Sequence, residues 1–299
     1  MRFKMTGLVA ATFTPMHEDG SLNLGQVETI VQHLIDGGVA GLYVCGTTGE
    51  GPSLSTEERE AVAAAYVAAA RGRVPVVVQV GHTSLADAAR LARHARTVGA
   101  QAMSAVAPWY FKPDSLPVLV DCLKTITSAA PDLPFYYYHM PSITGVDFDV
   151  RLLLQAAGEH LPSLVGIKYS ATRIDQMQAC VELDDGRYDV LFGCDEMLLS
   201  ALAVGVRGAV GSTYNFLAPL YGRLVAAFQA NDSDQARRLQ SQAVRIIQPV
   251  VRLRGVAGLK AAMKILGVDC GPCRLPLQTV RADELERLRQ ELVECEGCT

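Results

Sequence analysis

The feature of this sequence that most constrains its fold is a repeated alternation of two kinds of segment. Short apolar runs rich in β-branched residues recur along the chain, and stretches of helical length rich in Ala, Leu, Arg and Glu separate them. Each run is apolar on both faces, as expected for parallel strands buried between a barrel interior and an outer ring of helices. We count eight such runs, at Gly7 to Thr14, Gly41 to Cys45, Val74 to Val80, Gln101 to Ala107, Pro134 to Tyr138, Leu164 to Lys168, Asp189 to Gly193 and Gly208 to Gly211.

The number of expected strands favours a closed barrel over an open sheet. A helical pattern follows every run, most clearly at Thr56 to Arg71, Ser84 to Val98 and Ala218 to Ala230. Eight βα units fit a (β/α)8 TIM barrel, whereas a doubly wound open sheet more often stops at about five or six strands. We therefore predict an α/β fold in which residues 1–230 form a TIM barrel.

The remaining residues carry helical patterns and no convincing strand. These patterns lie at Asp234 to Pro249, Gly258 to Leu266 and Arg281 to Glu294. We therefore predict that residues 231–299 form a C-terminal helical extension.

Composition excludes several classes of partner. The chain has 299 residues, of which 49% are hydrophobic, and a net charge of −4, so no basic surface for nucleic acid is expected. Its apolar stretches fall short of the roughly 20 residues that span a bilayer, so we expect no membrane segment. The apolar run Gly7 to Ala11 is short for a signal peptide, and Pro15 and Glu18 follow it. We expect a cytoplasmic protein.

The eight cysteines are mostly scattered through apolar segments, which indicates reduced, buried thiols. Two Cys-x-x-Cys pairs, Cys270/Cys273 and Cys295/Cys298, are spaced almost as in a zinc ribbon. The second pair lies at the chain end, where termini fray, so we favour independent thiols over zinc or a disulfide. The sequence has no His-Glu-x-x-His, Gly-x-Gly-x-x-Gly or P-loop pattern, and we expect neither a catalytic metal nor a cofactor.

Lys168 is the first candidate for chemistry, because a TIM barrel builds its active site at the C-terminal ends of its strands. The residue ends the sixth run, where its neighbours predict burial. Burial disfavours the ammonium form of a lysine, and a neutral amine is a nucleophile suited to forming a Schiff base with a ketone. The alternative is a lysine that reaches solvent or pairs with a carboxylate.

Tyr138 closes the fifth run and is the second candidate. Strand alternation points Tyr136 and Tyr138 to one side and Tyr137 to the other. A phenol at the rim could carry a proton to and from a substrate, although aromatic side chains could equally fill the barrel. We expect the adjacent His139 to be a hydrogen-bonded structural histidine.

The loop Cys45 to Gly51 follows the second run and combines two hydroxyls with glycines. The hydroxyls of Thr47 and Thr48 and the free backbone N–H groups predict a nest for a carboxylate, with an ordinary tight turn as the alternative. A phosphate is less expected, because Glu50 would repel it. The spacing Ser55-x-x-Glu58 predicts a capping box at the start of the next helix.

Two further strand ends carry polar side chains. The segment from Gly193 to Glu196 follows the seventh run, and Ser212 follows the eighth. The neighbouring carboxylates of Asp195 and Glu196 could accept hydrogen bonds from a polyol or chelate a cation. Equally, Asp195 could cap the next helix with Glu196 in its first turn.

In barrel order, the motifs Gly46-Thr47-Thr48-Gly49-Glu50, Tyr138 and Gly166-Ile167-Lys168 resemble those of the dihydrodipicolinate synthase/N-acetylneuraminate lyase superfamily of pyruvate aldolases. The likeness runs from Thr12-x-Thr14-Pro15 to the C-terminal helices. It implies a Schiff base on Lys168, a proton relay through Tyr138, and a pyruvate carboxylate held by Thr47 and Thr48.

Within this superfamily the chain resembles the N-acetylneuraminate lyase branch, especially its animal-type members. The lysine-pathway synthases carry an arginine shortly after the Tyr-x-x-Pro segment, and Ile143 stands there in this chain. The resemblance implies that sugar hydroxyls are bound around Gly193, Asp195, Glu196 and Ser212. Ser170 stands where bacterial-type lyases often have threonine, and we expect it to contact substrate.

The resemblance implies an activity and an assembly. The activity is that of a class I aldolase that cleaves N-acetylneuraminate to pyruvate and N-acetylmannosamine without a cofactor. Alternatives are another pyruvate-dependent aldolase or dehydratase, including 4-hydroxy-tetrahydrodipicolinate synthase, and a catalytically silent binder of small molecules. Trp109-Tyr110 resembles a segment that reaches into a neighbouring subunit, which implies a homotetramer. We assign auxiliary places around the site to Tyr43 and Tyr110.

Overall fold

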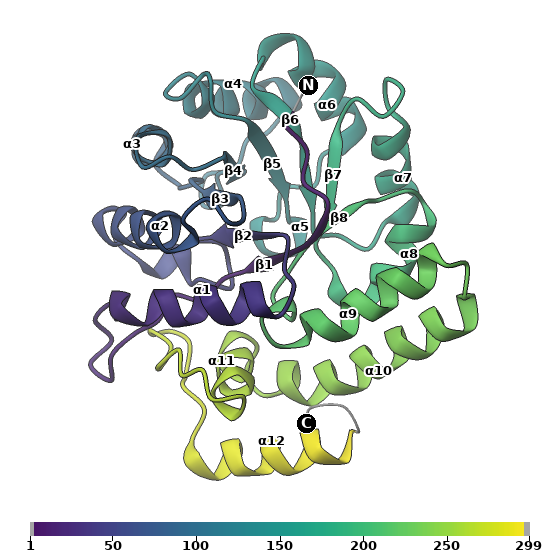
Figure 1. Cartoon of the computed structure of the whole chain (residues 1–299). Coiled ribbons are helices and arrows are strands. Elements are labelled where there is room, and N and C mark those ends of the chain that lie inside the picture. The colour runs from purple at the N-terminus through teal and green to yellow at the C-terminus, as the bar shows by residue number, and fades with distance from the viewer. Residues whose placement is uncertain (1–2, 296–299) are drawn as a thin grey trace.

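Eight parallel strands form a closed barrel in the computed structural model, which describes residues 3–295 (Figure 1). Each strand pairs with its neighbours in sequence, and the first strand pairs with the last. The strands are β1 (Gly7–Ala11), β2 (Gly41–Val44), β3 (Val76–Gln79), β4 (Ala102–Val106), β5 (Phe135–His139), β6 (Leu164–Tyr169), β7 (Asp189–Phe192) and β8 (Gly208–Gly211). The predicted TIM barrel is confirmed.

Helices follow the strands and surround them. They are α1 (Val27–Asp36), α2 (Thr56–Ala70), α3 (Leu85–Thr97), α4 (Leu116–Thr127), α5 (Pro141–Thr144), α6 (Val150–His160), α7 (Ile174–Glu182), α8 (Leu198–Ala203) and α9 (Tyr214–Gln229). The connections contain the short 3-10 helices η1 (Leu24–Gln26), η2 (Gly51–Ser53) and η3 (Asp195–Met197). The predicted capping box is present at the start of α2, where Ser55 and Glu58 bond reciprocally.

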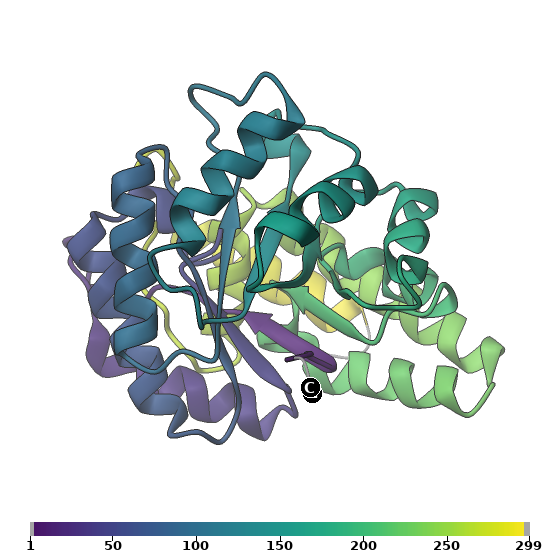
Figure 2. The same cartoon turned by 90° about the horizontal axis from the view of Figure 1, so that it is seen from above.

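In the part of the chain up to residue 295, three further helices follow the barrel: α10 (Ser233–Arg252), α11 (Val256–Ile265) and α12 (Ala282–Glu294). Helices α9 and α10 run side by side in both views (Figure 1, Figure 2). Helix α11 packs against α10, and α12 packs against both. The predicted C-terminal helices are therefore present, each within a few residues of its expected bounds.

The strands are apolar on both faces because they separate two cores. Outward-facing side chains such as Tyr137 pack against the helices. Inward-facing side chains, among them Tyr43, Tyr136 and Tyr138, fill the barrel. The predicted alternation along β5 is therefore confirmed.

Helix α9 begins at Tyr214, four residues before the predicted start at Ala218. Pro219 lies inside the helix and has no N–H to donate to the carbonyl of Asn215. A ring nitrogen of His33 lies 2.9 Å from that carbonyl oxygen and replaces the missing donor. The helix therefore tolerates a proline that sequence patterns treat as a boundary.

The cysteines that the structure describes are free thiols. Cys270, Cys273 and Cys295 form no disulfide, and Cys298 lies outside the described residues. Residues 3–295 contain no cluster of three or more His, Cys, Asp or Glu side chains arranged to hold a metal ion. None of their helices combines the length and the apolar character needed to cross a membrane.

Candidate active site

Lys168 and Tyr138 lie side by side at the C-terminal end of the barrel. The register of β5 and β6 pairs these two residues directly, and both project into the barrel. Lys168 is 4% exposed, and its Nζ lies 4.0 Å from the ring centroid of Tyr43 and 4.2 Å from that of Tyr138. The predicted burial of Lys168 is confirmed, and a lysine that reaches solvent is excluded. Among the described residues its amine has aromatic neighbours and no carboxylate partner.

The hydroxyl of Tyr138 meets a sulfur atom. It donates a hydrogen bond of 2.9 Å to Sδ of Met140, and the hydroxyl of Thr47 lies 3.6 Å from the same sulfur. A thioether is a weak acceptor, so neither hydroxyl is committed to a strong bond. Met140 was not among the predicted site residues, because a methionine after a strand carries no sequence signal for this role.

The loop after β2 is held in a compact shape. Glu50 N donates to Thr47 O at 3.0 Å, and Gly51 N donates to Gly46 O at 3.1 Å. The hydroxyl of Thr48 lies 2.5 Å from that of Ser212, which joins this loop to the one after β8. The barrel therefore brings Thr47, Thr48 and Ser212 together at one end.

Glu50 does not face the hydroxyls of this loop, contrary to the assumption that it would repel a bound phosphate. Its carboxylate is 2% exposed and lies 2.7 Å from Nζ of Lys260 on α11. At this distance the positive charge of Lys260 balances the negative charge of the Glu50 carboxylate. The sequence offered no signal for this pair, because its members stand far apart in the chain.

Asp195 is a buried carboxylate with one unused oxygen. Its Oδ2 accepts hydrogen bonds from Thr213 N at 2.9 Å and Thr213 Oγ1 at 2.6 Å, whereas Oδ1 has no partner in the described structure. Burial raises the pKa of Asp195 to about 6, although the bonds from Thr213 lower it. The alternative in which Asp195 caps the helix that follows it is wrong, because Cys194 occupies the N-cap position of η3 and the Asp195 carboxylate binds Thr213, after β8. Glu196 follows it in the first turn of η3 and is exposed.

Ser170 and Gly193 occupy neighbouring strand ends. Ser170 N donates to His139 O at 2.9 Å, and Gly193 N donates to Tyr169 O at 2.8 Å. A Cβ at position 193 would overlap Oγ of Ser170. Glycine at 193 therefore leaves room for the Ser170 hydroxyl at the mouth of the barrel.

Tyr110 and Ile143 lie on the surface. Tyr110 is 77% exposed and packs edge-on against Phe111, which is 87% exposed. Ile143 on α5 is 60% exposed. Among the described residues, Tyr43 is thus the one predicted auxiliary residue whose ring contacts Lys168.

His139 is buried, and neither of its ring nitrogens has a hydrogen-bond partner in the described structure. Its ring stacks on Tyr169 at 5.2 Å between centroids. Burial lowers the pKa of His139 to about 4, despite Asp147 nearby. The histidine is structural, but the prediction that it is hydrogen-bonded is wrong, because aromatic stacking holds the ring.

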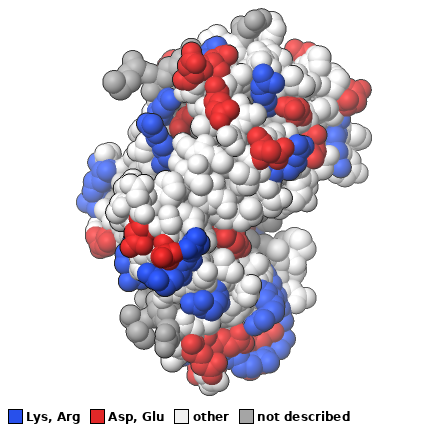
Figure 3. Space-filling model, turned by 90° about the vertical axis from the view of Figure 1, so that its right-hand side faces the viewer, with Lys and Arg blue, Asp and Glu red and all other residues white. Residues whose placement is uncertain are grey.

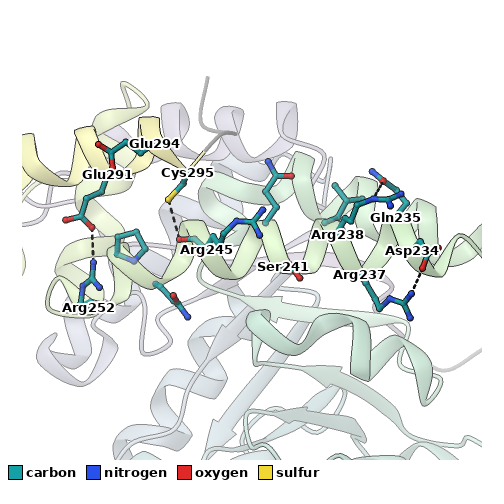
Figure 4. Close-up of a pocket in the computed structure, with 14 residues that line it drawn as sticks. Asp234, Gln235, Arg237, Arg238, Ser241, Arg245, Arg252, Glu291, Glu294 and Cys295 are labelled. Atoms are coloured by element: carbon teal, nitrogen blue, oxygen red, sulfur yellow. Dashed lines mark hydrogen bonds and ion pairs between the residues drawn. The ribbon is translucent and has the colours of Figure 1, made fainter.

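A groove lies away from these residues. It has a volume of about 1090 Å³ and runs along α10 beside the end of α12 (Figure 4). Its walls mix both charge signs, as in the ion pair of Arg252 with Glu291 at 2.9 Å. Figure 3 shows the same interspersion of acidic and basic side chains over the face that it displays. The groove contains none of the predicted site residues.

Comparison with known proteins shows which family this chain resembles. The model of the dihydrodipicolinate synthetase family matches residues 4–295. N-acetylneuraminate lyase A of Xenopus laevis is 40% identical over 295 residues, which cover 97% of this chain and 96% of the relative. N-acetylneuraminate lyase of Rattus norvegicus is 42% identical over 280 residues, which cover 92% and 88%.

A solved structure agrees with this assignment. The N-acetylneuraminate lyase of Proteus mirabilis superposes with a TM-score of 0.96 at 38% identity and covers 98% of this chain and 99% of its own. The family model, the relatives and the fold agree over nearly the whole length. The chain belongs to the dihydrodipicolinate synthetase family.

Proposed function

We propose that this protein is an N-acetylneuraminate lyase, a class I aldolase that cleaves N-acetylneuraminate to pyruvate and N-acetylmannosamine. The observation that carries the proposal is the buried amine of Lys168 beside Tyr138 at the C-terminal end of the barrel. The names of relatives about 40% identical over nearly the whole chain support the choice of substrate.

The first step is formation of an imine on Lys168. The neutral amine attacks the C2 ketone of the open-chain substrate, and loss of water gives an iminium ion. The amine of Lys168 lies against the rings of Tyr43 and Tyr138 and has no carboxylate partner among the described residues, so no ion pair competes with its attack on a carbonyl carbon. The iminium then accepts the electron pair released when the substrate's carbon chain breaks.

The second step is proton transfer through Tyr138. The phenol takes the proton of the C4 hydroxyl while it passes its own proton to the substrate carboxylate, and the C3–C4 bond breaks. N-acetylmannosamine leaves, and the electron pair of the broken bond forms an enamine of pyruvate on Lys168. Protonation at C3 and hydrolysis of the imine then release pyruvate and restore the amine.

The other residues bind the two ends of the substrate. The hydroxyls of Thr47 and Thr48 hold the carboxylate of the pyruvate half. The unpartnered Oδ1 of Asp195, supported by Glu196, Ser212 and Ser170, accepts hydrogen bonds from sugar hydroxyls. Gly193 leaves room for Ser170.

The test is release of pyruvate from N-acetylneuraminate by the purified protein, with Lys168→Ala as the blank. We expect release that is lost in the variant, and borohydride with pyruvate should add mass at Lys168. Labelling of Lys168→Ala at wild-type level would overturn the assignment of the nucleophile.

A second candidate is another pyruvate-dependent aldolase or dehydratase, including 4-hydroxy-tetrahydrodipicolinate synthase. Ile143 weighs against the synthase, since this exposed apolar side chain offers no charge to a second substrate's carboxylate. Pyruvate trapped on Lys168 without cleavage of N-acetylneuraminate would favour this candidate. Trapping without turnover of any 2-oxo acid would favour a silent binder.

We also propose that the protein assembles as a homotetramer in the cytoplasm. Exposed Tyr110 and Phe111 support the assembly, because two neighbouring aromatic side chains in water mark an interaction surface. The free thiols suit a reducing compartment. Mass measured in solution tests the assembly, and Phe111→Asp should lower it.

A further inference from the structure

Glu50 is a buried carboxylate that directly follows Thr48-Gly49. It is 2% exposed, and its backbone φ of 54° lies in the left-handed region, which is unfavourable for a residue with a side chain. A buried carboxylate and a strained backbone persist only where the surroundings stabilise both. The contacts of Glu50 therefore show what fixes this loop.

Both carboxylate oxygens of Glu50 bind the C-terminal part of the chain. Oε1 lies 2.7 Å from Nζ of Lys260, which is itself 4% exposed. Oε2 accepts a hydrogen bond of 2.8 Å from Arg274 N. Lys260 also donates to Pro272 O at 2.7 Å, so helix α11 and the segment after it hold Glu50 together.

The position of Glu50 is transmitted to the threonines by the backbone. Its N–H donates to Thr47 O at 3.0 Å, which closes a turn around Thr48 and Gly49. Thr14 holds the other side of that turn, through a 2.6 Å hydrogen bond to Gly49 O. Displacing Glu50 would therefore displace the hydroxyls of Thr47 and Thr48.

The segment that holds Glu50 has a second anchor. The guanidinium of Arg274 bonds to both carboxylate oxygens of Glu58 on α2 at 2.6 Å and to Gly20 O at 2.8 and 2.9 Å. Arg274 is thus fixed to the barrel independently of Glu50. The segment after α11 is therefore bonded to the barrel at Glu58 and Gly20 as well as at Glu50.

We propose that Glu50 is a positioning residue, whose ion pair with Lys260 lets the C-terminal helices hold the loop in the shape that binds the substrate carboxylate. The proposal rests on the function proposed above, which assigns that carboxylate to Thr47 and Thr48. It predicts that a change on α11, which contributes no side chain to the substrate, alters affinity for pyruvate.

The experiment measures affinity for pyruvate separately from turnover. The variants are Glu50→Gln, Lys260→Met and the double variant. Readouts are the pyruvate concentration that gives half-maximal borohydride trapping on Lys168, together with KM and kcat for N-acetylneuraminate. We expect Glu50→Gln to raise the half-trapping concentration and KM about tenfold and to change kcat less than about threefold.

A matched control is Glu284→Gln. Glu284 is 8% exposed and forms a 2.7 Å ion pair with Arg254, within the C-terminal helices and away from the loop. Its loss should lower Tm and leave the half-trapping concentration within about twofold of wild type. The control therefore shows how much stability is lost with any buried ion pair. A change in the half-trapping concentration that appears only in Glu50→Gln is then an effect on the loop.

The double variant and Lys260→Arg keep the test decisive if Glu50→Gln folds poorly. Glu50→Gln/Lys260→Met leaves no unpaired buried charge, so it should recover stability without recovering affinity for pyruvate. Lys260→Arg keeps a cation and should retain more affinity than Lys260→Met. Affinity that stays at the wild-type value in the double variant would overturn the proposal. A wild-type protein that traps no pyruvate would instead overturn the proposed function, and this role with it.

Discussion

Two tyrosines on one strand have opposite surroundings. Tyr136 and Tyr138 both project from β5 into the barrel, two residues apart. The hydroxyl of Tyr136 donates to Asp189 Oδ2 at 2.6 Å, and the same oxygen accepts from Met5 N. The hydroxyl of Tyr138, nearer the C-terminal end, donates to the thioether of Met140 and has Lys168 against its ring.

The difference separates an end of the barrel where the phenol is held by a strong hydrogen bond from the end where we propose that chemistry takes place. Tyr136 is bound to a carboxylate, and burial together with that carboxylate raises its pKa. A hydrogen bond to a charged acceptor is strong and holds both partners in place. Tyr138 has a weak acceptor that a substrate can replace. One residue type therefore serves structure at one end and is available for chemistry at the other.

The strongest test of this difference is to remove the hydroxyl of Tyr138 and that of Tyr136 in separate variants. We expect Tyr138→Phe to lower kcat by about 10²–10⁴-fold, the range for loss of a general acid-base group, and to keep imine trapping on Lys168. Tyr136→Phe should retain kcat within about threefold and lose about 1–3 kcal/mol of unfolding free energy, because Asp189 loses a donor. Steady-state kinetics and denaturant unfolding measure both. Equal loss of imine formation and turnover in Tyr138→Phe would indicate that the phenol only positions substrate.

A second prediction concerns Asp195, the carboxylate that we propose to bind sugar hydroxyls. Its pKa is raised to about 6 by burial, so it is protonated below that pH and accepts sugar hydroxyls fully only above it. We expect kcat/KM for N-acetylneuraminate to rise with pH through about 6, by up to about tenfold per unit. Asp195→Asn should remove that step from the pH profile. If Asp195→Asn still shows the rise of kcat/KM near pH 6, another group causes that rise.

The same raised pKa has a stability consequence of defined sign. Folded Asp195 binds its proton more tightly than the unfolded chain, so its stabilising contribution is present at low pH and is lost as pH rises through about 6. Asp195→Asn should therefore gain stability relative to wild type above pH 6 and little at pH 4. Unfolding curves at the two pH values measure this difference.

The smallest expected effect is that of Met140→Leu. Leucine fills a similar volume and removes the sulfur acceptor of Tyr138 and Thr47. Because a thioether bond is weak, we expect kcat to change by less than about threefold. A loss of kcat above about tenfold would mean that Met140 orients the phenol of Tyr138. The hydroxyls of Tyr136 and Tyr138 would then both be held in place, one by a carboxylate and the other by a thioether.

Sequence reasoning predicted that the candidate side chains lie at strand ends, but it did not predict which groups they contact. The positions of Lys168 and Tyr138 at the C-terminal end of the barrel were predictable, because each closes an apolar run. Met140, Thr213 and Lys260 were not, because their roles depend on contacts that no spacing rule encodes. His139 was predicted to be structural, yet its stacked, unbonded ring was not foreseen.

The sequence by itself determined the alternation of strands and helices, and hence the barrel, because hydrophobic periodicity and helix caps act over a few neighbouring residues. Only the tertiary structure decided which buried groups are paired. Barrel closure places Lys168 against Tyr43, turns Asp195 toward Thr213 and brings Lys260 to Glu50. A buried charge acquires its partner from the three-dimensional packing around it, and that packing joins residues more than two hundred positions apart, as Arg274 N and Glu50 show.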